Sequence, residues 1–214
     1  MEFPIVMADV INSGRKNSSL LMQQLKDVVA IVNRQKSKNL ISPLTITLGD
    51  EFQGLTNTME NGVKTIFDIE EIILDKQYDL KLRYVLLYGE IDTKINNKIA
   101  YEMLGEGLTN ARKDINSLKN KDARFHIRLN KNEEKKEQYL NKAFFIYQNF
   151  VDSWKEKDLE IVKQFLLHED YKIVAQNVNI DQSNAWRRKK SLNIHEYNDI
   201  KKIILFILNS KYEL

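Results

Sequence analysis

The chain has 214 residues, of which 43% are hydrophobic, and a formal net charge of +3 at pH 7. That apolar fraction can bury a core, and the length suits one large domain or two small ones. No apolar run is long enough to span a bilayer, and the lack of cysteine excludes disulfides, thiolate metal sites and cysteine nucleophiles. We therefore expect a cytoplasmic protein with no membrane partner, and the small net charge does not by itself indicate nucleic-acid binding.

Glycine and proline divide the chain into two parts of different character. All seven glycines lie between Gly14 and Gly107, and both prolines lie in the first half. Because these residues are the main turn formers, turns are expected early and uninterrupted helices late. We predict an α+β domain over residues 1–130, a connector helix over 131–155 and an all-helical domain over 156–214.

The first part alternates short apolar strands with amphipathic helices. In chain order, the pattern predicts strand 3–9, a helix from about Ser18, strands 44–48 and 51–55, helix 57–75 and strand 80–90. This βαββαβ order is typical of a ferredoxin-like sheet, in which the first and third strands are neighbours at the centre. The topology therefore brings together the end of the first strand and the start of the third.

Acidic residues stand at the strand ends that this topology brings together. Asp9 closes the first strand, and Asp50 and Glu51 follow Gly49 in a tight turn. We expect Asp9 and Asp50 to face each other across neighbouring strands, where two carboxylates repel unless a cation lies between them. Mg²⁺ or Mn²⁺ held by few carboxylates and by substrate phosphates fits this position. The alternative is that Asp9 is a strand-end residue and Asp50 an ordinary turn residue.

The segment after the first strand offers a place for phosphate groups. Asn12, Ser13 and Gly14 lead toward a helix, and backbone N–H groups in such a loop can bind phosphates. We predict that these three residues, together with Gly49 in the facing turn, contact a nucleotide.

Two arginines in this part have simple interpretations. Arg83 stands in an apolar strand and is expected at a sheet edge, or with its charged end reaching solvent. Arg112 lies on a predicted helix of mixed charge, where an exposed face is the ordinary position for such a residue.

Four blocks of the first part occur in an order that resembles a known family. The blocks are residues 7–11, 47–52, 82–90 and 105–112. In this order they resemble the SatD family of bacterial proteins over nearly the whole chain, and they are similar to the palm domain of nucleotidyl cyclases and GGDEF proteins. The resemblance implies a palm domain in which Asp9 and Asp50 hold metal ions and Glu51 matches the second acid of the GGDEF motif.

Other positions depart from the cyclase pattern. Ile46 stands where adenylyl cyclases have a purine-selecting lysine, and Thr109 and Lys113 stand where they have the asparagine and arginine that stabilise the transition state. Phosphoryl transfer depends on charge placed at the transition state. Glu51, Arg112 and Lys113 are the candidate catalytic residues, and a domain that binds a nucleotide without turnover is equally compatible.

The second part contains a pattern of two short helices joined by a turn. Residues 171–178 and 182–190 have helical patterns, and 179–181 form the turn. Asn179 stands where such turns usually have glycine, and asparagine tolerates the left-handed conformation better than most residues. Asp181 can cap the second helix. The spacing is that of a helix-turn-helix, and the stretch resembles those of sigma-region-4-like and SatD-like proteins.

A basic run falls on the second of these helices. In a helix-turn-helix this helix enters the major groove, where its first turn reaches base edges and its basic side chains reach phosphate or guanine. The predicted DNA contacts are Gln182, Ser183 and Asn184 with bases, and Arg187, Arg188 and Lys190 with phosphate or guanine. The alternatives are a solvated helix face and a helical interaction module that does not bind DNA.

Two functional motifs in one chain suggest a regulator. We predict a homodimer that binds DNA through its C-terminal domain and binds a nucleotide, with Mg²⁺ or Mn²⁺, in its head. Two alternatives stay open. One is an active nucleotidyl cyclase or nucleotidyltransferase that uses two-metal catalysis. The other is a non-catalytic head that only dimerises the C-terminal domain.

Overall fold

The structure, a computed structural model, describes residues 1–12, 18–47 and 49–210. Within these ranges five strands form one mixed sheet in the order β2-β3-β1-β4-β5. The strands are β1 (Glu2–Val10), β2 (Leu40–Ile46), β3 (Glu51–Thr56), β4 (Leu82–Glu90) and β5 (Phe125–Arg128). Neighbouring strands are antiparallel, except that β4 and β5 are parallel. The fold is therefore α+β, and β1 lies at the centre next to β3, as the βαββαβ order predicts.

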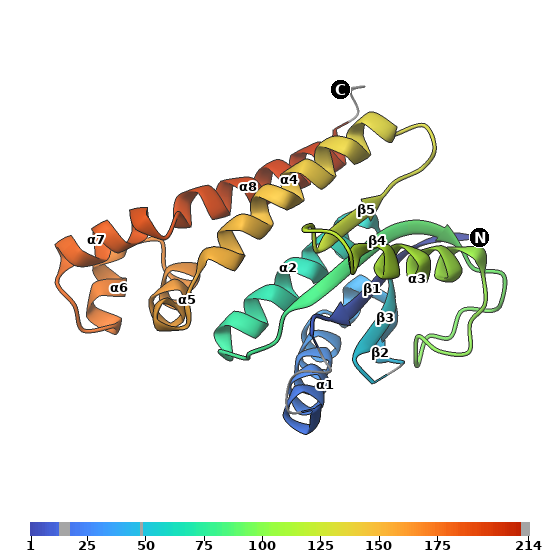
Figure 1. Cartoon of the computed structure of the whole chain (residues 1–214), viewed down its shortest axis with the longest axis horizontal. Coiled ribbons are helices and arrows are strands. Elements are labelled where there is room, and N and C mark those ends of the chain that lie inside the picture. Colours follow the sequence, from blue (N-terminus) through green and yellow to red (C-terminus); the bar gives the residue numbers. More distant parts are fainter. Residues whose placement is uncertain (13–17, 48, 211–214) are drawn as a thin grey trace.

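Helices cover both faces of the sheet (Figure 1). On one face lie α1 (Ser18–Gln35), α2 (Met59–Asp75) and α4 (Glu134–Ser153), and on the other lies α3 (Glu106–Leu118). The chain continues through α5 (Leu159–Leu167), α6 (Tyr171–Asn177), α7 (Gln182–Ser191) and α8 (Ile194–Asn209), with short 3₁₀ turns at Ser37–Asn39 and Glu156–Asp158. Of the helices in the described ranges, none combines the length and the apolar character needed to cross a bilayer.

Alternation of side chains along β1 sends apolar residues to both faces of the sheet. Val6 and Ala8 join the cluster beneath α1 and α2, whereas Ile5 and Met7 join the cluster beneath α3. Both faces of the central strand are buried, as its continuous apolar run indicates. Continuing the alternation places the Asp9 side chain on the α3 face.

Close packing of α3 against the sheet depends on two glycines. A Cβ atom at Gly107 would lie 2.7 Å from the backbone of Gly89 and 2.7 Å from Ile5 Cδ1. Contacts that short do not occur between ordinary side chains and backbone, so a larger residue at this position would push α3 away from the sheet. The two glycines thus set how closely the side chains of α3 approach the ends of the central strands.

The apolar core runs without interruption from the sheet into the C-terminal helices. α4 packs against β5 and α8, and the Tyr147 ring lies 5.0 Å from that of Phe67 in α2 and 5.5 Å from that of Tyr197 in α8. α6 and α7 lie at the far end of the α4–α8 pair (Figure 1). The helix predicted over 131–155 is therefore part of the core, and the domain boundaries on either side of it stay a prediction.

A buried ion network joins the sheet to α2 and α4. Arg124, just before β5, donates two hydrogen bonds to Glu70 of α2, of 3.0 and 2.6 Å, and one of 3.1 Å to Asp152 of α4. Tyr84 Oη of β4 donates to Glu70 at 2.7 Å. Burial lowers the pKa of Arg124, but the opposite charges of Glu70 and Asp152 outweigh burial, so the pKa lies above its usual value. The guanidinium therefore stays charged inside the core.

Removing Arg124 leaves a buried carboxylate without its partner. Arg124→Met should lower the free energy of unfolding by about 3–5 kcal/mol, because Glu70 loses the charge that compensates its burial. Urea denaturation measures the change. Lys64→Met, which breaks the partly exposed Lys64–Glu60 pair, should lower it by less than about 1 kcal/mol. Equal effects of the two substitutions would show that the network contributes little to stability.

Candidate functional site

Three charged side chains form a row across the neighbouring strands β3, β1 and β4, which we call the charged row. In the strand register, Asp9 of β1 is opposite Glu51 of β3 on one side and opposite Arg83 of β4 on the other. Residues paired in this way point to the same face, which here is the face that α3 covers. Asp9 and Glu51 are both buried. Two carboxylates therefore lie side by side in a buried position at one end of the sheet.

The turn before β3 places Glu51, and not Asp50, opposite Asp9. Gly49 has a φ of 83°, which glycine adopts without strain, as expected for a tight turn. Asp50 precedes the strand, and its carbonyl accepts a hydrogen bond of 3.0 Å from the Val10 N–H. The prediction that Asp9 and Asp50 face each other is therefore wrong by one residue, and a shift of one residue in a strand changes the face to which a side chain points.

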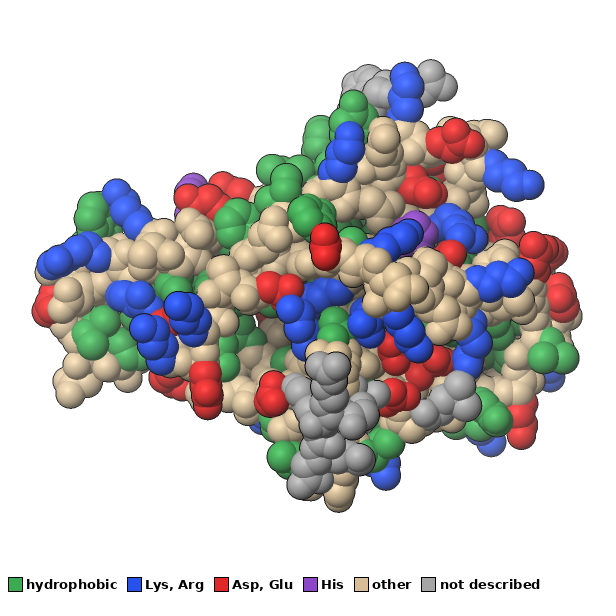
Figure 2. Space-filling view, in the orientation of Figure 1, with side chains coloured by type: hydrophobic (Ala, Val, Ile, Leu, Met, Phe, Trp, Pro, Cys, Tyr) green, Lys and Arg blue, Asp and Glu red, His purple; other side chains and the backbone are tan. Residues whose placement is uncertain are grey.

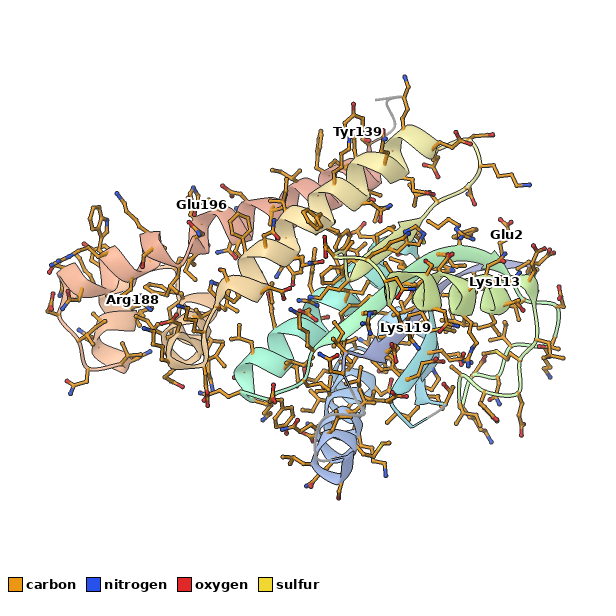
Figure 3. The ribbon with its side chains drawn as sticks, in the orientation of Figure 1. Glu2, Lys113, Lys119, Tyr139, Arg188 and Glu196 are labelled. Atoms are coloured by element: carbon orange, nitrogen blue, oxygen red, sulfur yellow. The ribbon has the colours of Figure 1, made fainter. Side chains whose placement is uncertain are left out.

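Positive side chains surround the two carboxylates. Arg83 Nη1 lies 3.2 Å and Lys119 Nζ 3.8 Å from Asp9 Oδ2. Arg112 of α3 forms an ion pair with Glu51. Figure 2 shows Lys and Arg side chains gathered beside Asp and Glu side chains on this part of the surface, and Figure 3 places Lys119 near the end of α3. The charge of the carboxylates is thus balanced by cations from β4 and α3 and from the residue that follows α3.

The position of Arg83 corrects one prediction and shows what sequence reasoning missed. β4 lies between β1 and β5, so Arg83 is not at a sheet edge, and its side chain is only 15% exposed. A charge within an apolar strand was the available signal, because a buried charge needs a partner. Lys119 carries no such signal, since its contact with Asp9 depends on how α3 crosses the sheet. Arg112 is half-buried in the site and does not lie on an open face.

Burial raises the pKa of both carboxyl groups. For Asp9, burial outweighs the opposing charge of Lys119, and the nearby charge of Asp50 raises the pKa further. For Glu51, burial outweighs the charge of Arg112. Ionised forms of these groups are therefore less favourable here than in water, and additional positive charge would stabilise them.

The two carboxylates suit a divalent metal that arrives with ligands of its own. Within the described ranges, no three Asp, Glu or His side chains are grouped closely enough to hold a metal ion. Asp9 and Glu51 are adjacent oxygen donors, and Mg²⁺ is commonly held by one or two carboxylates together with phosphate oxygens and water. The donor set thus fits a metal–nucleotide complex better than a preformed metal cage.

A pocket of about 660 Å³ opens beside the charged row. α3 contributes Thr109, Arg112 and Lys113 to its wall, and the turn before β3 contributes Thr47. Since Arg112 also contacts Glu51, the structure brings the three candidate catalytic residues to one place. The pocket is large enough for a small-molecule ligand.

The predicted phosphate-binding loop falls only partly within the described residues. Ser13 and Gly14 lie outside them, and Asn12 is exposed with a φ of 60°. The N–H groups of Val10 and Ile11 already donate to backbone carbonyls, so they are not open to a phosphate group. A contact of this loop, or of the facing turn, with a nucleotide stays a prediction.

α6 and α7 are two short helices joined by a turn, at the positions predicted. Asn179 has a φ of 53°, in the left-handed region, and Asp181 caps α7 by accepting the Asn184 N–H at 2.8 Å. Val174 of α6 and Ala185 of α7 are fully buried. The local geometry of the turn thus follows from the residues that form it, and its contact with DNA stays a prediction.

The predicted DNA-contacting side chains have different surroundings within the chain. Arg188 forms an ion pair with the buried Asp158 carboxylate, just before α5. Arg187 is exposed, and Lys190 Nζ lies 3.9 Å from the centre of the exposed Trp186 ring. Figure 3 shows Arg188 on α7, far from the head of the molecule. Arg187 and Lys190 are therefore better placed than Arg188 for an external partner.

One known protein family matches this chain over most of its length. The family model described as the SatD family matches residues 3–205. The chain belongs to the SatD family. The blocks that resemble that family all lie within the matched range. No curated protein sequence matches this SatD family chain.

Similar solved structures include three nucleotidyl cyclases. A bacterial light-regulated adenylyl cyclase matches with a TM-score of 0.45 and 15% identity, over 59% of this chain and 74% of that one. The catalytic core of a rhodopsin-guanylyl cyclase with converted specificity, in complex with ATPαS, gives 0.41 and 16% over 53% and 72%. A guanylate cyclase domain from Catenaria anguillulae, in complex with GTP, gives 0.38 and 17% over 52% and 70%.

The buried Asp9 carboxylate should make this SatD family protein lose stability as pH rises. A carboxyl group whose pKa is raised on folding holds its proton more tightly in the folded state. Its contribution to stability is therefore present below the ordinary pKa of 3.8 and is lost as pH rises through the raised value. The Asp9→Asn variant has no carboxyl group to titrate at this position, so it does not lose this stability as pH rises. The melting temperature of the variant minus that of the wild type should therefore be higher at pH 7 than at pH 4.

Thermal denaturation at both pH values, without divalent ions, measures this difference. Asp92→Asn, at an exposed position just after β4, is the matched control and should show no such pH-dependent difference from the wild type. If the difference between Asp9→Asn and the wild type is the same at pH 4 and pH 7, the raised pKa of Asp9 is not real.

Proposed function

We propose that this SatD family protein is a regulator whose head binds a divalent metal ion together with a nucleotide. The observation that carries the proposal is the buried Asp9–Glu51 pair, which lies beside a pocket walled by Arg112 and Lys113. Carboxylates suit Mg²⁺ or Mn²⁺, and guanidinium and ammonium groups suit phosphate oxygens. Both parts of a metal–nucleotide complex therefore find matching groups at one end of the sheet.

The residues of the charged row, and the charged residues beside it, each have a role in this proposal. Asp9 and Glu51, which the strand register places side by side, hold the metal, and Asp50, the ligand predicted from the sequence, is the neighbouring acid. A bound divalent ion would neutralise phosphate charge and orient the nucleotide. Arg83 and Lys119 hold the Asp9 side chain in place and balance its charge, through the 3.2 and 3.8 Å contacts. Asn12, Ser13, Gly14 and Gly49 are the backbone positions that we propose for the phosphates.

Turnover to a cyclic product is the second candidate function. It is favoured by Arg112, which stands one position from the cyclase register and yet reaches Glu51 in the site. Ile46 and Thr109 stand where adenylyl cyclases have the purine-selecting lysine and the asparagine that stabilises the transition state. Because these two groups are missing, we propose nucleotide binding without turnover first. Conversion of ATP or GTP to a cyclic product, lost in Asp9→Ala, would establish an active cyclase or nucleotidyltransferase instead.

Calorimetric titration of ATP and GTP, with and without Mg²⁺ or Mn²⁺, tests the head. Binding should require the metal, and Asp9→Ala and Glu51→Ala should each weaken it by at least about tenfold because a metal ligand is lost. Asp199→Ala, on α8, should leave binding unchanged. If neither nucleotide binds in the presence of metal, the proposal is wrong, and a head that only dimerises the C-terminal helices becomes the better description.

The regulatory output in this proposal is DNA binding through α7. It is supported by the turn at Asn179, by the cap at Asp181, and by the exposed basic residues Arg187 and Lys190. α6 and α7 lie at the end of the molecule away from the sheet, where a duplex could approach without meeting the head (Figure 1). The first turn of α7, from Gln182 to Asn184, is where contacts with base edges are expected.

Apolar side chains on α4 and α8 provide a surface for a second copy of the chain. Tyr139, Phe145 and Ile146 of α4 and Ile203 and Phe206 of α8 are exposed, on two helices that pack side by side. Figure 2 shows hydrophobic side chains along this pair of helices. A two-fold dimer formed here would carry two α7 helices, as proteins that read paired half-sites do. The proposal therefore includes a homodimer.

Fluorescence anisotropy with a pool of random-sequence duplexes, over a range of salt concentrations, tests the DNA surface. Arg187→Ala and Lys190→Ala should each weaken binding and reduce the slope of log K against log salt by about 1, because each removes one charge that neutralises a phosphate. Lys202→Ala, on exposed α8 surface, should change neither quantity.

Two results would contradict this part of the proposal. Unchanged affinity in both α7 variants would exclude α7 as the DNA surface. Sedimentation of the complex should give two chains per duplex, and a stoichiometry of one chain would exclude the homodimer.

A further inference from the structure

The pocket beside α3 changes character from one end to the other. Near the start of α3 its wall consists of Tyr101, Leu104 and Leu108, and nearer the carboxylates it consists of Arg112 and Thr47. Tyr101 is 50% and Leu104 71% exposed. Large apolar side chains that line a pocket and remain exposed commonly mark a ligand surface. The pocket therefore offers an apolar end and a cationic end to one molecule.

The helix α3 sets the distance between these two ends. Leu108 and Arg112 are four residues apart on one side of the helix, which separates them by about 6 Å along its axis. Lys119, about 10 Å further along the same side, reaches Asp9. Figure 3 shows Lys113 and Lys119 on this part of the chain. One side of α3 thus leads from an apolar group to a guanidinium and then to an ammonium group beside the carboxylates.

The loop that carries Tyr101 is anchored to the sheet. The Ala100 N–H donates to Thr45 Oγ1 at 2.8 Å, and the Ala100 carbonyl accepts from Gln53 Nε2 at 2.6 Å. Tyr101 follows this anchor directly. Its backbone is therefore held in position before any ligand arrives, which reduces the entropy lost when a ligand packs against the ring.

From this arrangement we infer that the pocket binds a nucleotide in one orientation, with the base against Tyr101 and the phosphates at Arg112. The inference rests on the proposed function and adds which end of the nucleotide lies where. A base stacks on an aromatic ring, and phosphate oxygens take charge-assisted hydrogen bonds from a guanidinium. Phosphates at Arg112 lie toward Asp9 and Glu51, where the metal is proposed. Since every base has a π-face, Tyr101 adds affinity for a base without selecting one.

Calorimetry with two ligands separates the ends of the pocket. The ligands are MgATP and magnesium tripolyphosphate, which has a phosphate chain but no base. Tyr101→Ala should weaken MgATP binding by about tenfold, since it removes the stacking surface, and should leave tripolyphosphate binding within about twofold of the wild type. Tyr101→Phe keeps the ring and should keep MgATP affinity. Arg112→Ala should weaken both ligands.

Leu167→Ala is the control, because Leu167 is a large exposed apolar side chain at the end of α5 and does not line the pocket. It should change binding of neither ligand. No loss of MgATP affinity in Tyr101→Ala, or an equal loss for the two ligands, would overturn the orientation and leave nucleotide binding itself standing. Failure of the wild type to bind either ligand would overturn the proposed function and the orientation together.

Discussion

The buried guanidinium of Arg124 determines how the two halves of this molecule fit together. It contacts Glu70 of α2 and Asp152 of α4, and its backbone N–H donates to Gln148 of α4 at 2.7 Å. A buried charge is tolerated only when all of its partners are present, so α2, α4 and the start of β5 must take their positions together. Tyr84, bonded to Glu70, is the neighbour of Arg83 on β4, so the same network positions one end of the charged row on the opposite face.

Three cations contact the carboxylates of the charged row, and one of them is much less exposed to solvent than the other two. The Arg83 side chain is 15% exposed, whereas those of Arg112 and Lys119 are 38% and 48% exposed. Arg83 therefore supports Asp9 from within the sheet. Arg112 and Lys119 have the access to solvent that contact with phosphate groups requires. Without a ligand, these ion pairs balance the charge of the carboxylates. In the proposed function, the metal ion of a metal–nucleotide complex would contact the carboxylates, and its phosphate groups would contact the cations.

The proposed regulator needs a physical connection between the head and the C-terminal helices. α2 supplies it, because its far face contacts α5 and α8. Lys163 of α5 lies 3.0 Å from Asp75 at the end of α2, and Lys201 of α8 pairs with Glu71. Both contacts belong to the helix that also carries Glu70. A ligand that favours one position of the strands would thus act on the C-terminal helices through contacts that already exist.

Sequence by itself determined that β1 and β3 are neighbours at the centre of the sheet, and it determined the turn at Gly49, the left-handed Asn179 and the cap at Asp181. Turns and caps depend on dihedral preferences and hydrogen bonds within about four residues, which a local pattern contains. Only the tertiary structure decided that Glu51 faces Asp9, that Arg83 lies at the sheet centre and that Lys119 reaches the site. Arg83 and Asp9 are 74 residues apart, and Arg112 and Glu51 are 61 apart. Such contacts depend on strand register and on how closely α3 packs, and neither is encoded in a short stretch of residues.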